Sequence, residues 1–151
     1  MGAFTAETCV VQSTLPLYNK PVIQLYCTKI VHICCSYPNF LDEEDYKKVD
    51  PDSYHQLARE IDQLNLDQIS IEDAHCANNL ILLELFEKKT IIFATIAIAR
   101  SRLESMEEVT GRIKVALGQI DRDRLVIATD FGLGFLSEEL AAAKDVMCRA
   151  T

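Results

Sequence analysis

His32 and Cys34 stand two residues apart at the end of an apolar run, directly before a loop that contains a proline, in the stretch VHICCSYPN. Residues two apart on a β-strand project to the same side, so both side chains can point at one ion while Ile33 faces away. Zinc accepts imidazole nitrogen, thiolate sulfur and carboxylate oxygen, and a catalytic zinc site commonly uses three protein ligands. Glu72 ends the next β-rich run and completes such a set. His32, Cys34 and Glu72 are therefore candidate zinc ligands.

A simpler interpretation fits the same residues. Free cysteine prefers protein interiors, so an ordinary buried thiol at a strand end also explains the His-x-Cys pattern. Cys35, His75 and Cys76 are further donors that could join a metal site if the loops bring them near. His75 is otherwise expected to be a solvated loop histidine. A redox role for Cys34 and Cys35 is a poor alternative, because adjacent cysteines rarely form an unstrained disulfide.

Four β-rich runs, each followed by a helical pattern, carry these residues. The runs cover 29–34, 68–72, 90–99 and 124–130. This alternation is typical of βα units around a parallel sheet. In such an architecture, reactive groups gather where the carboxyl ends of the strands meet the loops. The ends of the first two runs are thus expected to bring the three candidate ligands to one edge of the sheet.

The helical patterns carry recognisable start signals. Asp50 before Pro51 predicts the first helix, and Ser105 with Glu108 forms a capping box. Ser137 is expected to cap a C-terminal helix, and a leucine-rich helix is expected over 79–88, with Asp73 capping it. Two apolar stripes should be buried: Tyr54, Leu57, Ala58, Ile61 and Leu64 in the first helix, and Met106, Val109, Ile113, Ala116, Leu117 and Ile120 in the third.

Length and composition limit the kinds of protein that this chain can be. The 151 residues suit one soluble domain, and the net charge of -8 without a basic patch argues against binding to nucleic acid. The longest apolar run, 91–99, is far shorter than the roughly 20 residues of a membrane-spanning helix. Six cysteines and an N-terminal stretch without secretion-signal features favour free thiols. We expect a cytoplasmic protein that binds neither membranes nor nucleic acid.

Four βα units amount to half of a (β/α)8 barrel. A complete barrel takes roughly 250 residues, so this chain can close one only with a second copy or a partner chain. We therefore expect an α/β protein with a partial (β/α)8 TIM barrel, in which residues 29–151 form about half of the barrel. Residues 1–28 do not fit the alternation and stay an unassigned N-terminal segment.

Several segments together resemble a known family. The stretches VHICCSYPN, QISIEDAH, LLELFEKKTIIFATIAIARSRLESMEEVTGRI and RLVIATDFGLGFLSEELAAAKDVM are similar, in order and spacing, to the C-terminal catalytic domain of cobalamin-independent methionine synthase. The resemblance covers roughly residues 29–150 and implies that residues 29–151 are the second half of the barrel. It implies a (β/α)8 barrel with a zinc ion that binds the homocysteine thiol and helps it ionise. The thiol would then take a methyl group from methyltetrahydrofolate, as in a 5-methyltetrahydropteroyltriglutamate-homocysteine S-methyltransferase.

The resemblance also assigns the ligands. The family's His-x-Cys falls on His32 and Cys34, and its glutamate falls on Glu72. The fourth ligand in the family is the cysteine of an Asp-Cys-Gly-Leu motif, but the matching residue here is Phe131, which cannot coordinate zinc. The homocysteine- and folate-binding residues of the family lie largely on earlier strands that this chain does not contain. The alternative to a zinc-dependent methyltransferase is therefore a non-catalytic half-barrel that acts as a scaffold or interaction protein.

Overall fold

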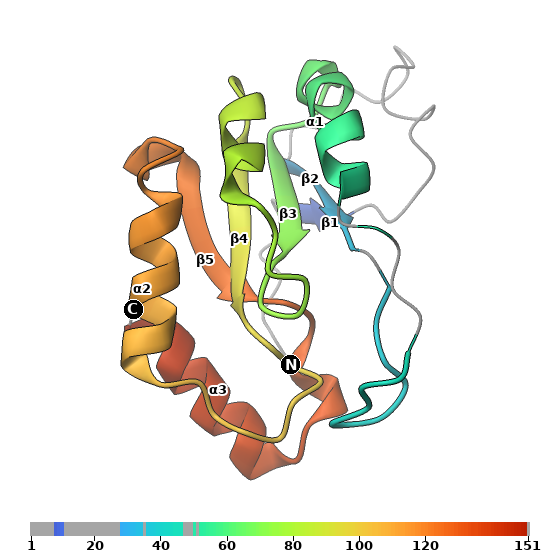
Figure 1. The fold of residues 1–151 in the computed structure, drawn as a ribbon, viewed down its shortest axis with the longest axis vertical. Coiled ribbons are helices and arrows are strands. Elements are labelled where there is room, and N and C mark those ends of the chain that lie inside the picture. Colours follow the sequence, from blue (N-terminus) through green and yellow to red (C-terminus); the bar gives the residue numbers. More distant parts are fainter. Residues whose placement is uncertain (1–7, 11–27, 35, 47–49, 51, 151) are drawn as a thin grey trace.

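In the computed structural model, strands of the described residues form one parallel sheet in the order β1-β2-β3-β4-β5 (Figure 1). The structure describes residues 8–10, 28–34, 36–46, 50 and 52–150. The strands are β1 (Thr8–Val10), β2 (Thr28–Ile33), β3 (Gln68–Glu72), β4 (Thr90–Ile96) and β5 (Leu125–Thr129). Because all strands run in one direction, their carboxyl ends meet at a single edge of the sheet.

One face of the sheet holds the hydrophobic core. Ile69, Ile71, Ile91 and Phe93 alternate with their neighbours along β3 and β4, and each is at most 1% exposed. In the register of the sheet, Ile71 is paired with Phe93 and Phe93 with Ile127, so these side chains form a continuous row. Such unbroken apolar packing is what a strand covered by helices requires.

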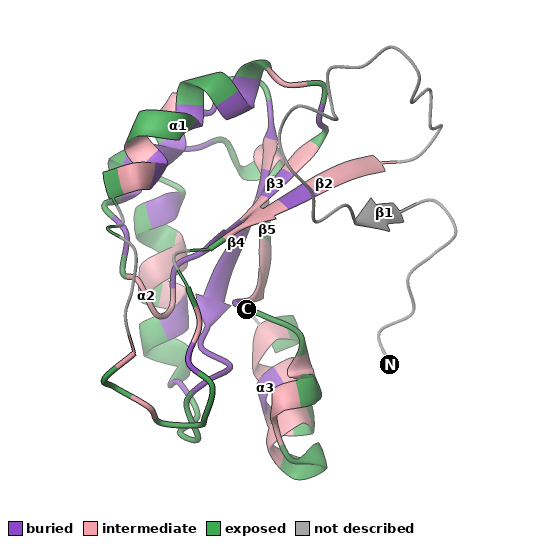
Figure 2. Cartoon of the chain, turned by 90° about the vertical axis from the view of Figure 1, so that its right-hand side faces the viewer, coloured by how far each residue is buried: buried purple, intermediate pink, exposed green. Residues whose placement is uncertain are grey.

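Three helical segments cover this face: α1 (Asp52–Gln63), the 3₁₀ helix η2 (Leu80–Leu85) and α2 (Met106–Ala116). Figure 2 shows α1 and α2 on the same side of the sheet. Their buried residues include Ala58, Leu83 and Ala116. The predicted apolar stripes are only partly correct, because Leu57, Met106 and Leu117 are exposed by 42%, 38% and 42%.

The opposite face of the sheet is less covered. His32, Ser70, Ile92 and Val126 form a row across β2 to β5 in the register of the sheet. The first three are half-buried, and Val126 is 42% exposed. This face would point into the lumen if the sheet were continued into a barrel.

The helix starts follow the local signals in the sequence. The Ser105 side chain accepts from the Glu108 backbone N–H at 3.2 Å, and the Glu108 carboxylate accepts from the Ser105 N–H at 2.7 Å, which confirms the capping box. Asp50 Oδ1 accepts from the Asp52 N–H at 3.0 Å, and Ser137 Oγ accepts from Leu140 at the start of α3 (Glu138–Ala150). Pro51 lies outside the described residues.

Three features differ from the sequence-based expectation. The leucine-rich segment is the short 3₁₀ helix η2, and Asn79 rather than Asp73 caps it. The expected strand over 90–99 ends at Ile96, with a register shift between Ala94 and Ile96. Strand β1 pairs with β2 although it falls in the N-terminal segment that the alternation left unassigned. A strand of three residues is too short to show periodicity in a sequence.

No helix within the described residues is long and apolar enough to cross a membrane.

Candidate functional site

His32 meets the usual requirements of a metal-binding histidine. Its Nδ1 lies 2.9 Å from the Ser70 hydroxyl oxygen on the neighbouring strand. Its Nε2 is buried and has no hydrogen-bond partner among the described residues. Metal-ligating histidines are commonly oriented through a hydrogen bond on the other ring nitrogen, which is the arrangement that Ser70 provides. Burial lowers the pKa of His32, which favours the neutral imidazole.

Glu72 is completely buried at the carboxyl end of β3. The Cys76 thiol donates to Glu72 Oε1 at 3.3 Å. The structure therefore brings together a carboxylate and a thiol that the sequence had offered only as a substitute donor. A thiol and a carboxylate side by side can bind a cation or share a proton.

Cys34 follows the end of β2 and is exposed. No three histidine, cysteine, aspartate or glutamate residues of the described segments are grouped closely enough to hold a metal ion. His32 and Glu72 fit zinc in chemistry and burial, and their joint use with Cys34 stays a prediction. Cys35 lies outside the described residues.

Phe131 belongs to an aromatic cluster beside His32. Its ring lies edge-on to the His32 ring with centroids 6.0 Å apart, and it stacks on Tyr37 at 5.2 Å. Tyr37 in turn contacts Phe135 and His75 edge-on, at 6.5 and 5.3 Å. The residue that replaces the family's cysteine thus packs against the imidazole. His75 is half-buried against Tyr37 and is not the solvated loop residue that we expected.

Asp130 holds the loop that follows Glu72. Its Oδ1 accepts from the backbone N–H groups of Asp73 and Ala74 at 3.1 and 3.2 Å, and its Oδ2 accepts from His75 at 3.1 Å. Burial and then the negative charge of Glu72 raise the pKa of Asp130 well above its usual value, although the backbone N–H groups oppose this shift. Burial and the charge of Asp130 likewise raise the pKa of Tyr37. The carboxyl ends of β3 and β5 are thereby tied together.

A second network supports the same loop from the helix side of the sheet. Arg112 on α2 forms two hydrogen bonds to the Asp73 carboxylate, at 2.6 and 2.7 Å, and a third to the Asn78 carbonyl. Asp73 Oδ1 also accepts from the Asn78 N–H, and the Asn78 amide donates to the Glu72 carbonyl at 2.6 Å. The loop that follows Glu72 is therefore held from both faces of the sheet. Asp73 has a structural role, as expected from its position beside Glu72.

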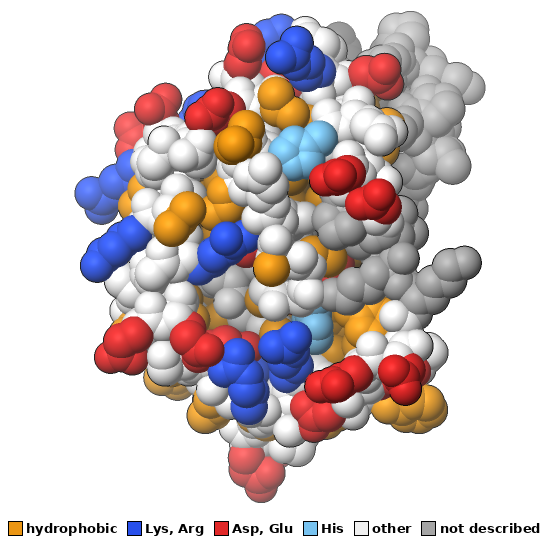
Figure 3. All heavy atoms as spheres, viewed as in Figure 1, with side chains coloured by type: hydrophobic (Ala, Val, Ile, Leu, Met, Phe, Trp, Pro, Cys, Tyr) orange, Lys and Arg blue, Asp and Glu red, His pale blue; other side chains and the backbone are white. Residues whose placement is uncertain are grey.

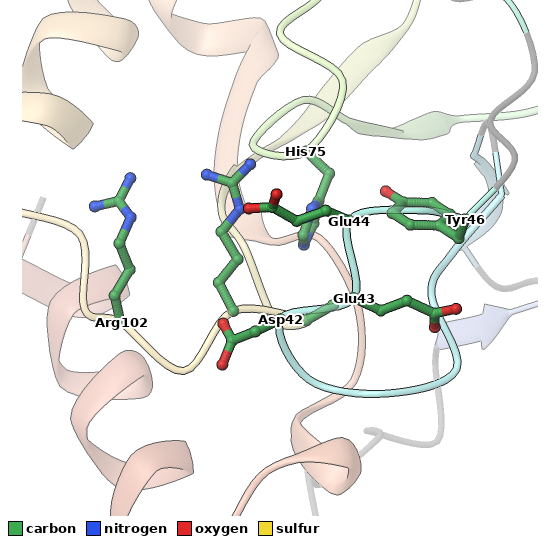
Figure 4. Close-up of a pocket in the computed structure, with 8 residues that line it drawn as sticks. Asp42, Glu43, Glu44, Tyr46, His75 and Arg102 are labelled. Carbon is green, nitrogen blue, oxygen red and sulfur yellow. The ribbon is translucent and has the colours of Figure 1, made fainter.

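A cavity of about 450 Å³ opens beside this loop. His75 comes from the loop after β3, Arg102 from the loop after β4, and the remaining labelled residues from the loop after β2 (Figure 4). The loops are joined by hydrogen bonds between Asp42 and Ala99 and between Ser101 and Asp42. Side chains of both charges gather at this end of the molecule (Figure 3). Cavities of this size accept small molecules.

The family profile described as "Cobalamin-independent synthase, Catalytic domain" matches residues 49–150, which is more than half of the chain. The chain belongs to this family. The matched range contains Glu72, Asp130 and Phe131, whereas His32 and Cys34 precede it. No protein of curated function matches the sequence.

A solved structure supports the same conclusion. The chain is similar to a B12-independent methionine synthase from Shewanella sp. W3-18-1, determined in complex with selenomethionine, with 27% sequence identity and a TM-score of 0.68. The similarity covers 85% of this chain and 38% of that one, so the chain spans well under half of its solved relative. The chain is a methionine-synthase-like domain, and the expected partial barrel is confirmed.

The residues that support the candidate ligands could not be predicted from the sequence. Ser70 and Tyr37 have no signal of their own in the sequence, because their roles depend on strand register and on loop packing. Asp130 ends the β-rich run 124–130, but its three backbone contacts lie 55 to 57 residues away along the chain. Phe131 was identified through the family resemblance alone.

Proposed function

We propose that this chain is a methyltransferase domain of the methionine synthase type. In this proposal it transfers a methyl group from methyltetrahydrofolate to the thiol of homocysteine, with zinc bound by His32, Cys34 and Glu72. Family membership supports the reaction class. The observation that carries the metal assignment is the buried Nε2 of His32, which has no hydrogen-bond partner among the described residues while Ser70 engages the other ring nitrogen.

Zinc would supply a positive charge that keeps a bound thiol deprotonated near neutral pH. The residues of the chain have separate tasks. His32 would provide a neutral nitrogen donor in an orientation fixed by Ser70. Glu72 would provide a buried negative charge, and Asp130 would keep the loop after Glu72 in place through three backbone N–H groups. Cys34 would have to leave solvent to join them, because it is exposed in this structure.

The metal content of the purified protein tests the assignment. We expect zinc to copurify with the chain when no metal is added, and the His32→Ala substitution to abolish it. His55, on α1, is a matched control, and His55→Ala should keep the metal. Cys34→Ser and Cys76→Ser identify the thiol ligand, since the proposal requires loss of zinc only in Cys34→Ser. Metal-free wild-type protein would contradict the zinc assignment, and methionine formation from both substrates tests the reaction itself.

Phe131 favours a second function, that of a non-catalytic half-barrel. Its ring occupies the position of the family's fourth ligand and packs against His32 and Tyr37. A packed aromatic cluster of this kind stabilises the loops without a metal. If the protein contains no zinc and folds normally without it, the scaffold function is the one supported.

We further propose that the half-barrel associates with a second copy or a partner chain, and that it works in the cytoplasm. The half-buried row of His32, Ser70 and Ile92, with the exposed Val126, supports the association. The free thiol of Cys34 supports a reducing compartment. The mass of the protein in solution tests association, and fractionation of cells that produce it tests the location.

A further inference from the structure

A smaller cavity of about 220 Å³ lies between the end of β4, the loop after β3 and helix α2. Thr95 and Asp73 line it, and they alternate with Ala94 and Glu72, which face the other side of the sheet. The cavity therefore lies on the helix side, away from the candidate zinc ligands. A change in one site can be made without altering the side chains of the other.

Each carboxylate that lines this cavity already has a basic partner. The pairs are Asp73 with Arg112 at 2.6 Å, Glu104 with Lys144 at 3.0 Å and Glu108 with Arg102 at 3.1 Å. Arg100 lines the cavity as well, but it forms no hydrogen bond or salt bridge with any described residue. The nearby Asp42 carboxylate accepts from the Ser101 N–H, and the charge of Arg100 helps to lower the pKa of Asp42. Arg100 is thus the one cation of the lining that has no hydrogen bond or salt bridge to a described residue.

The hydroxyl of Thr95 is the second unusual group. Thr95 is 6% exposed, and its Oγ1 is buried without a hydrogen-bond partner among the described residues. A buried hydroxyl without a partner is costly, so such groups usually bond to something that fills the adjacent space. Thr95 lies in the register shift of β4, where the strand departs from regular pairing and approaches α2.

We propose that this cavity binds the carboxylate group of a small molecule. The guanidinium of Arg100 would hold the carboxylate, and the Thr95 hydroxyl would donate a hydrogen bond to one of its oxygens. A monoanion adds the least negative charge to a lining that already contains three carboxylates. A phosphate dianion would leave excess negative charge beside Asp73, Glu104 and Glu108, in a protein whose net charge is already -8.

The proposal is tested with sodium acetate and the full-length protein. We expect acetate to shift the backbone amide signals of Thr95, Ala97 and Arg100 in a saturable way in ¹H–¹⁵N spectra, with sodium chloride of the same ionic strength as reference. Arg100→Gln should weaken acetate binding by at least about tenfold, because it removes the charge-assisted hydrogen bonds. Thr95→Val should weaken it by a smaller factor and leave the fold intact.

Arg59→Gln is the matched control, because Arg59 is an exposed arginine on α1 far from the lining residues. Acetate binding should be unchanged in this variant. Shifts that rise linearly with acetate as they do with chloride, or that persist in Arg100→Gln, would overturn the proposal. Tighter saturation by inorganic phosphate than by acetate would also overturn it, since the carboxylate assignment depends on charge balance.

Discussion

Among single residues, two side chains of the site point to different functions. One is a histidine with a buried ring nitrogen, and the other is a phenylalanine at the position where the family resemblance places a cysteine ligand. His32 has one ring nitrogen bonded to Ser70 and the other buried without a hydrogen bond among the described residues. Phe131 packs against the same imidazole. His32 favours the zinc-dependent methyltransferase, whereas Phe131 favours the scaffold. Which function applies depends on the zinc affinity that remains with phenylalanine at residue 131.

Phe131→Cys should raise the affinity for zinc. Structural zinc sites bind with about 10–16 kcal/mol over four ligands, so a restored thiolate is expected to increase affinity at least about a hundredfold. Competition with a chromophoric chelator measures this change. Phe135→Cys, in the same aromatic cluster, is the control and should leave the affinity near that of the wild type. Equal affinities of wild type and Phe131→Cys would place residue 131 outside the metal site.

Asp130→Asn should loosen the loop after β3. Asparagine has a single acceptor oxygen, so at least one of the three backbone N–H groups would lose its partner, at a cost of about 1–3 kcal/mol. Hydrogen exchange of the amides of Asp73, Ala74 and His75 should accelerate. Asp123→Asn, at an exposed aspartate, should leave these amides protected. Unchanged exchange in Asp130→Asn would mean that the loop is held by the Arg112 network alone.

At the scale of elements, α3 is joined to the loop after β4 by a buried lysine. The Lys144 ammonium is fully buried, and it donates to Glu104 at 3.0 Å and to the Arg102 carbonyl at 2.8 Å. Glu104 also accepts from the Ala97 N–H, so one carboxylate connects the end of β4 to α3. The helix and the loop that carries Arg100 and Arg102 are thereby coupled.

Lys144→Met should destabilise the protein strongly. It leaves the buried Glu104 carboxylate without its cation, which costs about 3–5 kcal/mol in comparable sites. Arg149→Met removes an exposed pair with Asp145 on the same helix and should cost less than about 1 kcal/mol. Equilibrium unfolding in urea gives both values. Similar losses in the two variants would show that the buried pair adds nothing beyond a surface pair.

At the scale of the whole molecule, the protein is a parallel sheet with a well-covered face and a partly open one. Helices α1 and α2 bury the first face, whereas Val126 on β5 remains exposed on the second. Strand β5 pairs only with β4 among the described strands, so its outer edge has unpaired backbone groups. Both features favour association through this part of the sheet.

Val126→Lys should reduce self-association. A charge on the edge strand of the open face would have to be buried on association, which is unfavourable. We expect the wild-type mass by light scattering to exceed the 17.0 kDa of one chain and the variant to approach it. Val115→Lys, at an exposed position on α2, is the control and should associate like the wild type. A wild-type mass of 17.0 kDa at high concentration would remove the support for self-association.

Much of the architecture could be predicted from the sequence, because its signals are local. Alternation of β-rich runs and helical stripes located β2 to β5, and the Ser105 capping box marked the start of α2 to the residue. The 3₁₀ geometry of η2 was missed because a leucine-rich segment of six residues has the same pattern in either helix type. The tether between Lys144 and Glu104 was missed because no local signal couples residues 40 apart.

The site was less predictable than the fold. Position at the strand ends singled out His32 and Glu72, which are half-buried and buried in the structure, whereas Cys34 is exposed. Strand parity fixes the side to which a residue points, but not how far the chain turns after the strand ends. The Cys76 contact with Glu72 depends on such a turn, and only the structure shows it.

The edge of β5 has one more consequence, for growth of the sheet by addition of further copies. If β5 of one molecule pairs in parallel with the edge strand β1 of the next, the contact is head-to-tail. Two copies would place ten described strands in register, more than the eight of a TIM barrel, and such a contact propagates unless it closes into a ring. The apolar stretch LVIAT would then nucleate fibres as concentration rises, an outcome that thioflavin fluorescence detects and that Val126→Lys should suppress.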